Sequence, residues 1–273
     1  MNELYLSEIN IYPIKSLGGF RVQKAQIEER GLQYDRRWML VDEECIFITQ
    51  RKYFELSQLQ VNIAEGRLTV SHKTDLDQHI SFDLNEQTGE NIIVKIWDDV
   101  AVGLEVSKQV SDWFSNFMKM KVKLVKMPLD EKRLVDPKYA LNEEIVSFAD
   151  GYPCLIIGQS SLNALNKKLE EKILMDRFRP NFVFTGGEPH IEDRFGTFNL
   201  GEITFTAVKP CARCVLITIN QQTGIKSKEP LKTLATYRTI NKKIMFGQNL
   251  VHKGSGEISV GDELNIVSWK EGN

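Results

Sequence analysis

The sequence of 273 residues has few cysteines, no long apolar run and almost no net charge. Four cysteines in so long a chain argue against a disulfide-rich secreted protein, and Cys45 and Cys154 lie in apolar runs typical of small buried side chains. No run approaches the roughly 20 apolar residues of a membrane-spanning helix. The segment Met1–Tyr5 lacks the basic and apolar regions of a signal peptide. We therefore expect a cytoplasmic protein without a mitochondrial targeting segment or membrane anchor.

The charge balance argues against two further classes of partner. The chain has 35 Lys and Arg against 37 Asp and Glu, a net charge of −2. Proteins that bind nucleic acids or adsorb to membrane surfaces usually carry a basic excess. We therefore expect no nucleic acid and no membrane as partner, while a local cationic pocket stays open. The length suits one large domain or two ordinary ones.

Short strands dominate the predicted secondary structure. Apolar–polar alternation and short apolar runs predict strands at 4–11, 38–41, 45–48, 68–70, 92–97, 154–157, 181–185, 203–208 and 215–219, with hairpins at 38–48 and 258–266. Apolar spacings of three to four residues predict helices after Val106, after a cap at Ser160 or Ser161, and after Pro230. Because strands outnumber helices and do not alternate with them, we predict an α+β protein, predominantly β and built on barrels.

Two cysteines lie close together in Lys209-Pro210-Cys211-Ala212-Arg213-Cys214. Such thiols can bind a metal, attack an electrophile or form a disulfide. Structural zinc normally needs a second ligand pair, and His190 and His252 are isolated. The predicted strand at 215–219 argues against a thioredoxin-like pair, which opens a helix. Two readings remain open: one thiolate binds a soft metal, with Arg213 lowering the thiol pKa, or both thiols are inert.

Three cationic turns lie at the ends of predicted strands. The first contains Lys15 and Ser16 before two glycines, the second Arg36, and the third Arg179 and Asn181. Each turn alone is typical of a strand flank, but together they could converge on an anion. The glycines would let backbone N–H groups approach that anion. A further polar residue, Asp150 before a buried strand, is by default a carboxylate that caps a turn.

In order, four segments resemble motifs of the MOSC family, which is named after the C-terminal domain of molybdenum-cofactor sulfurases: Ile11-Tyr12-Pro13-Ile14-Lys15-Ser16, Asp35-Arg36-Arg37-Trp38, Arg177-Phe178-Arg179-Pro180-Asn181 and Cys211-Ala212-Arg213-Cys214. The chain is most similar to members with an N-terminal β-barrel, which include the mitochondrial amidoxime-reducing component and bacterial reductases of N-hydroxylated compounds. The resemblance extends over nearly the whole chain. It implies an N-terminal β-barrel-like domain at 1–125 and a MOSC-type mixed β-barrel with peripheral helices at 126–270.

The resemblance also implies roles for site residues. Cys214 would ligate molybdenum in a Mo-molybdopterin cofactor, and Asp150 would lie beside the metal, so both are the expected catalytic residues. The residues expected to hold the cofactor are Lys15, Ser16, Arg36, Arg179, Asn181, Cys211 and Arg213. Gly151 is a departure, because the mitochondrial reductases have a hydroxyl residue there.

The implied activity is reduction of a small N-hydroxylated substrate, such as an amidoxime or a hydroxylamine. Electrons would come from a separate donor protein, either a flavoprotein or an iron–sulfur or haem carrier, because the chain has no further cysteines for an iron–sulfur domain. No requirement for pyridoxal phosphate is implied. Two alternatives stay open: a sulfur-carrier or cofactor-delivery protein with a persulfide on Cys214, and a plain binding module with inert thiols.

Overall fold

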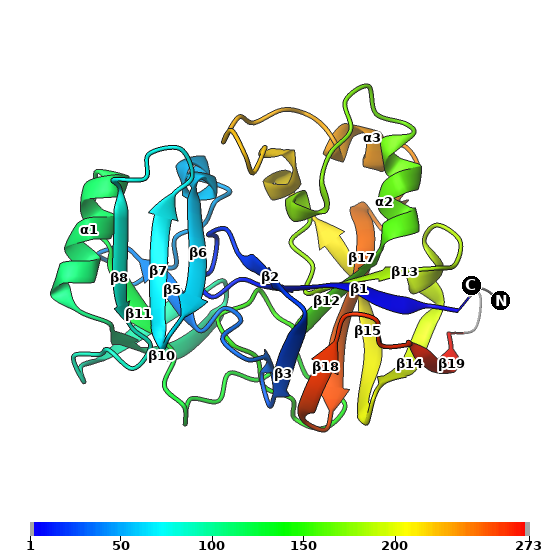
Figure 1. The fold of residues 1–273 in the computed structure, drawn as a ribbon, viewed down its shortest axis with the longest axis horizontal. Helices are drawn as coiled ribbons and strands as arrows, with labels where there is room; N and C mark the ends of the chain where they lie inside the picture. Colours follow the sequence, from blue (N-terminus) through cyan, green and yellow to red (C-terminus); the bar gives the residue numbers. More distant parts are fainter. Residues whose placement is uncertain (1–2, 271–273) are drawn as a thin grey trace.

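Strands dominate the fold of residues 3–270, which the computed structural model describes (Figure 1). The predicted α+β, predominantly β class is confirmed. Within these residues the α-helices are α1 (Lys108–Met118), α2 (Gln159–Asn166) and α3 (Leu231–Ala235). In α1, Ser107 accepts a hydrogen bond from the Val110 amide at the first turn, and Val110 and Phe114 are buried. The predicted apolar stripe therefore forms a helix because it covers the core of the N-terminal half.

A nine-stranded sheet forms the C-terminal half, on the right in Figure 1. Its strands in spatial order are β19 (Asn265–Trp269), β14 (Phe195–Leu200), β15 (Ile203–Arg213), β17 (Lys243–Lys253), β12 (Cys154–Gly158), β13 (Phe182–Thr185), β1 (Tyr5–Ile11) and β2 (Phe20–Val22), and β16 (Thr239–Ile240) pairs with β17. The pairing of β1 with β13 is antiparallel, so the first strand of the chain is built into this sheet. A three-stranded sheet of β18 (Gly256–Ser259), β3 (Lys24–Glu28) and β4 (Gly31–Leu32) makes a second connection between chain ends.

The N-terminal half contains two smaller sheets, on the left in Figure 1. The four-stranded sheet consists of β5 (Trp38–Val41), β11 (Lys123–Lys126), β10 (Asp99–Glu105) and β9 (Asn91–Ile96), and the three-stranded sheet of β6 (Leu59–Ala64), β7 (Arg67–His72) and β8 (His79–Asp83). The buried side chains of Gln50 and Gln221 link the two halves, because each Nε2 donates to the other's Oε1, at 3.2 and 3.0 Å. The candidate site is lined by residues from both halves.

The segment after Cys214 does not form the predicted strand. Val215–Thr218 is a short 3₁₀ helix, η4, which follows the end of β15 at Arg213. Thr218 Oγ1 donates to the Val215 carbonyl oxygen at 2.7 Å, and Ile217 and Thr218 are buried. Tertiary packing therefore overrides the strand propensity of these β-branched residues. The Cys-x-x-Cys segment ends a strand, and no strand follows it. A following strand therefore no longer excludes a thioredoxin-like redox pair.

Three smaller predictions are also wrong. Residues 258–266 form no hairpin, because β18 pairs with β3 while β19 pairs with β14. Neither candidate serine caps α2, which begins at Gln159 after Gly158; the hydroxyl of Ser161 donates instead to the buried Glu192 carboxylate at 2.9 Å. The segment 45–48 is not a regular strand, and Cys45 is half-buried at a turn with a φ of 59°. The predicted hairpin with 38–41 nevertheless forms, because the Asp42 and Ile48 amides donate to the Ile46 and Leu40 carbonyl oxygens at 3.0 and 2.8 Å.

Candidate functional site

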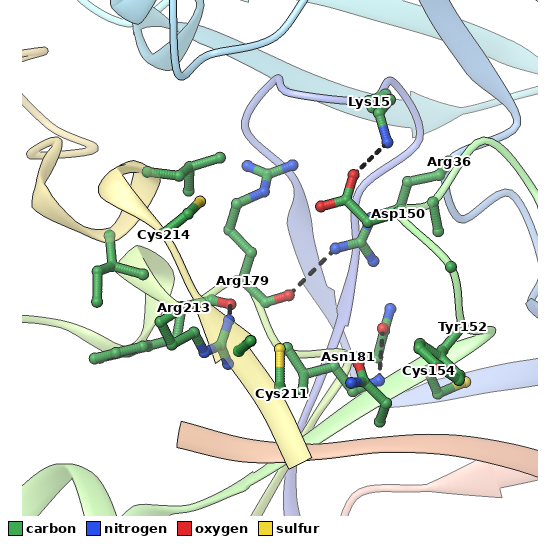
Figure 2. A pocket seen from close by; sticks show the side chains of 18 of the residues that line it. Lys15, Arg36, Asp150, Tyr152, Cys154, Arg179, Asn181, Cys211, Arg213 and Cys214 are labelled. Atoms are coloured by element: carbon green, nitrogen blue, oxygen red, sulfur yellow. Dashed lines mark hydrogen bonds and ion pairs between the residues drawn. The ribbon is translucent and has the colours of Figure 1, made fainter. Parts of the chain in front are cut away.

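A pocket of about 310 Å³ brings the predicted site residues together (Figure 2). Its lining includes every residue that the sequence analysis assigned to the site: Lys15, Ser16, Arg36, Asp150, Arg179, Asn181, Cys211, Arg213 and Cys214. These residues come from five separate segments of the chain, so only the fold can place them around one cavity. Their chemical roles stay predictions.

Three pocket residues have backbone conformations that side chains other than glycine rarely adopt. Ser16, Arg36 and Arg179 have φ values of 72°, 50° and 53°. Such conformations cost on the order of 1 kcal/mol each and persist where the surrounding structure fixes them. Arg36 is held in this way, because its amide donates to the Tyr12 carbonyl oxygen at 2.8 Å. Three strained residues around one cavity support a functional role for the pocket.

The two glycines after Ser16 do not line this pocket, contrary to the expectation that they approach an anion there. A Cβ atom on Gly19 would lie 2.2 Å from the Ile11 carbonyl oxygen, and one on Gly18 would lie 2.8 Å from the Leu59 carbonyl oxygen. Both positions therefore require glycine for close backbone packing. The charge and hydroxyl of Lys15 and Ser16 remain as the polar contribution of this turn.

Lys15 and Asp150 form an ion pair on one wall of the pocket (Figure 2). The buried Lys15 Nζ donates to Asp150 Oδ1 at 2.6 Å and to the Phe148 carbonyl oxygen at 2.8 Å. Burial lowers the pKa of Lys15 to about 8, despite the nearby carboxylate. Desolvation alone would raise the pKa of Asp150, but Lys15 and Arg51 outweigh it and hold that pKa well below its usual range. Asp150 is therefore ionised at neutral pH.

Arg51 joins Cys214 to Asp150 and was missed by the sequence analysis. Its Nε donates to Cys214 Sγ at 3.0 Å, and its Nη2 lies 3.0 Å from Asp150 Oδ2. The guanidinium lies 4.3 Å from the centre of the Trp97 ring, and Trp97 Nε1 donates to Asp150 Oδ1 at 3.3 Å. The only signal in the sequence is an arginine in a polar turn, which is too common to identify a site. Arg51 thus places a fixed cation beside the thiol expected to bind metal.

In the other two pocket cysteines, Cys211 and Cys154, burial disfavours the thiolate form. Burial raises the pKa of Cys211 and outweighs the opposing charge of Arg213, so Arg213 does not activate that thiol on balance. Arg213 Nε and Nη1 donate to the carbonyl oxygens of Phe246 and Phe178, at 2.8 and 3.0 Å. Cys154 is buried, as predicted, and burial raises its pKa.

Arg36 and Arg179 lie against the same buried aromatic ring. Their guanidinium carbons are 4.4 and 4.3 Å from the centre of the Tyr12 ring. Arg36 forms an ion pair with Asp35 at 2.6 Å, whereas within residues 3–270 the Arg179 side chain has no such partner. Burial, and then the charge of Arg36, lower the pKa of Arg179 to about 10. Nearby, Asn181 Nδ2 donates to the Asn10 carbonyl oxygen at 3.3 Å and so joins β1 to the residue before β13.

The donor groups of the pocket fit an anionic cofactor. Six cations line the pocket (Lys15, Arg36, Arg51, Arg179, Lys209 and Arg213), with Asp150 as the single carboxylate in the lining. Arg213 Nη2 is buried without a hydrogen-bond partner in the described residues, although such donors are normally satisfied. The same residues contain no group of three or more His, Cys, Asp or Glu that could hold a metal ion. A metal here would therefore need ligands besides the protein's own side chains.

Fold and site together define a predominantly β protein of two halves with a thiol at a cation-rich pocket. The chain belongs to the MOSC family: the MOSC domain matches residues 143–265, and the MOSC N-terminal beta barrel domain matches residues 3–121. The resemblance stated from the motifs is thereby confirmed. The predicted domain boundary at 125/126 stays a prediction.

Molybdenum cofactor sulfurases and mitochondrial amidoxime-reducing components are similar to this chain. Molybdenum cofactor sulfurase of Arabidopsis thaliana is 32% identical over 96% of this chain, but the chain spans only 35% of that protein. Mitochondrial amidoxime-reducing component 1 of Mus musculus is 29% identical, covering 96% of this chain and 82% of the relative. Mitochondrial amidoxime reducing component 2 of Homo sapiens is 30% identical, covering 85% and 72%. Between residues 3 and 270, none of the helices combines the length and apolar character needed to cross a bilayer.

Proposed function

We propose that this protein binds a molybdenum cofactor and reduces small N-hydroxylated substrates with electrons from a separate donor protein. The observation that carries the proposal is the position of Cys214, whose thiol lies in a pocket lined by six cations and one carboxylate. Soft thiolate sulfur suits molybdenum, and the cations suit a phosphate-bearing cofactor. Similarity to amidoxime-reducing components along most of the chain supports the choice of reaction.

In this proposal Cys214 would ligate the metal, while Lys15, Ser16, Arg36 and Arg179 would hold the anionic groups of the cofactor. Asn181, Cys211 and Arg213 would line the same cofactor site. When bound, the cofactor would supply the two-electron chemistry that converts an N–OH group to N–H, with two protons taken up and water released.

Asp150 and Lys15 would have different roles in proton transfer. Because its pKa is low, Asp150 would orient a water or substrate as a hydrogen-bond acceptor and would not deliver a proton. The proton that can leave near neutral pH is on Lys15 Nζ, whose pKa is about 8. Arg51, which contacts both Asp150 and Cys214, would fix their relative positions.

The alternative is a sulfur-carrier or cofactor-delivery protein. Cys214 Sγ accepts a hydrogen bond from Arg51, an arrangement that would also stabilise an anionic persulfide. Similarity to molybdenum cofactor sulfurases favours this reading, although the chain spans about a third of those proteins.

One preparation can decide between the two functions. The protein is purified from a host that makes molybdenum cofactor, and molybdenum, cyanolysable sulfur and benzamidoxime reduction with a chemical reductant are measured. About one molybdenum per chain with turnover supports the reductase. Persulfide sulfur without molybdenum supports the sulfur carrier, and absence of both contradicts both functions.

The lowered pKa of Lys15 predicts a pH dependence of anion binding. A lysine is cationic below its pKa, so Lys15 loses its charge as the pH rises through about 8, where an ordinary lysine keeps it. We expect the affinity of cofactor-free protein for sulfate, a probe whose own charge is constant, to fall about tenfold between roughly pH 7 and 9.5. Isothermal titration calorimetry at several pH values measures this.

A Lys15→Met variant should bind sulfate more weakly and with little change across this pH range. Lys253→Met removes a lysine of β17 that does not line the pocket, so it should retain the wild-type pH dependence. An unchanged pH profile in Lys15→Met would show that another group controls anion binding.

A further inference from the structure

Lys209 is a pocket cation without an anionic partner. Among the ion pairs of residues 3–270 none includes Lys209. The two other pocket cations without an ion pair are held differently: Arg179 lies with Arg36 at Tyr12, and Arg213 donates to the backbone carbonyl oxygens of Phe246 and Phe178. The Lys209 ammonium lies 4.1 Å from the centre of the Tyr139 ring and 5.6 Å from that of Tyr152. These contacts orient a cation but do not neutralise it.

The second group beside Lys209 is a hydroxyl with no partner. Tyr152 lines the same pocket, and its Oη atom is buried with no hydrogen-bond partner in the described residues. Burial, and then the negative charge of Asp136, raise the pKa of Tyr152, so the hydroxyl stays protonated and can act as a donor. Asp136 is not among the residues that line the pocket, and Lys209 offsets its charge beside Tyr152. A buried hydroxyl left without an acceptor is costly, and an oxyanion would satisfy it.

These two donors are separate from the cations assigned to the cofactor. Lys209 belongs to β15 and Tyr152 to the segment before β12, and the charge of Lys209 acts on Cys211. Lys15, by contrast, is paired with Asp150, and Arg36 with Asp35. Most cations assigned to the cofactor therefore lie around Tyr12 and Asp150, while Lys209 and Tyr152 form a further donor pair on the Cys211 side of the pocket. Arg213 also acts on Cys211, but its Nε and Nη1 donate to backbone carbonyl oxygens.

We propose that Lys209 and the Tyr152 hydroxyl form an anion subsite for the substrate, so that the preferred N-hydroxylated substrates carry a carboxylate or another acidic group. The inference rests on the proposed reductase function and names its substrate class. The ammonium, held on two aromatic rings, and the protonated hydroxyl would together bind an oxyanion, while the N–OH group lies elsewhere in the same pocket, toward Cys214.

The test compares two substrates that differ only in charge, benzamidoxime and 4-carboxybenzamidoxime. The cofactor-loaded protein should have a kcat/KM about tenfold higher for the carboxylated compound, the size expected for one hydrogen bond to a charged group. Lys209→Met should remove most of this preference, Lys209→Arg should retain it, and Tyr152→Phe should reduce it. High salt should weaken it. Lys253→Met, which lies outside the pocket, should retain it.

A binding measurement separates this inference from the reductase function. 4-Carboxybenzamide and benzamide have no N–OH group, so their affinities report the subsite without turnover. Stronger binding of the carboxylated amide that is lost in Lys209→Met supports the subsite, even if no substrate is reduced and the reductase function is wrong. Equal affinities in the wild type contradict the subsite. So does a loss of molybdenum from Lys209→Met, because the cofactor would then occupy these donors.

Discussion

Replacing Cys214 by alanine is expected to lower the reduction of N-hydroxylated substrates by at least about a thousandfold, with loss of bound molybdenum. The reason is the ligand count of the site. Cys214 is the pocket thiol that contacts a fixed cation, and the described residues contain no group of three or more metal-ligating side chains. Without this sulfur the thiols left in the pocket would be Cys211 and Cys154, in which burial disfavours the thiolate that a metal needs. Molybdenum per chain and the single-turnover reduction rate measure the two effects.

Two control variants distinguish loss of a ligand from general damage. Cys211→Ala removes a thiol from the same pocket, and because burial raises the pKa of that thiol we expect molybdenum to be retained. Cys45→Ala removes a thiol that does not line the pocket and should leave both quantities unchanged. Full activity in Cys214→Ala would remove the basis for the proposed reductase. Loss of persulfide sulfur from that variant, with no molybdenum in the wild type, would instead support sulfur transfer.

The site residues found from the sequence share one property. Lys15, Arg36, Arg179 and Cys214 each lie in a short motif that resembles one of the MOSC family, so comparison with those motifs is enough to select them. Arg51 has no such motif. It is 163 residues from Cys214 in the chain, and the contact between them depends on how the two halves pack. Interactions of this kind are set by the tertiary structure, so motifs do not reveal them.

The fold also has features that the sequence predicts and features that it does not. Local patterns predicted β5, β9, β12 and α1, because a short apolar run or a regular apolar spacing reflects the burial of the element itself. Long-range pairing did not follow from such patterns: β18 pairs with β3 across more than two hundred residues, and the sequence analysis joined it to the next strand instead. In η4 the β-branched residues pack without a strand partner, which local propensity cannot anticipate.

Replacing Arg133 by methionine is expected to lower the free energy of unfolding by about 3 kcal/mol. The side chain is 3% exposed and lies in the long connection between β11 and β12. Its Nη1 donates to the carbonyl oxygens of Ser147 and Ala149 at 2.8 and 2.6 Å, and its Nη2 to that of Asp150 at 3.1 Å. Methionine would fill much of the same volume but leave these carbonyl groups without donors.

The same substitution should impair the site, because these hydrogen bonds hold the loop that carries Asp150. For a chain of this size a loss of 3 kcal/mol corresponds to a fall in Tm of roughly 6–12 °C, measurable by calorimetry. Arg67→Met is the matched control, because Arg67 also donates to a backbone carbonyl oxygen, that of Ser81 at 2.8 Å, but on the exposed surface. Its stability should change by less than about 0.5 kcal/mol. Similar Tm values for the two variants would mean that the loop is held by other contacts, and that the position of Asp150 does not depend on Arg133.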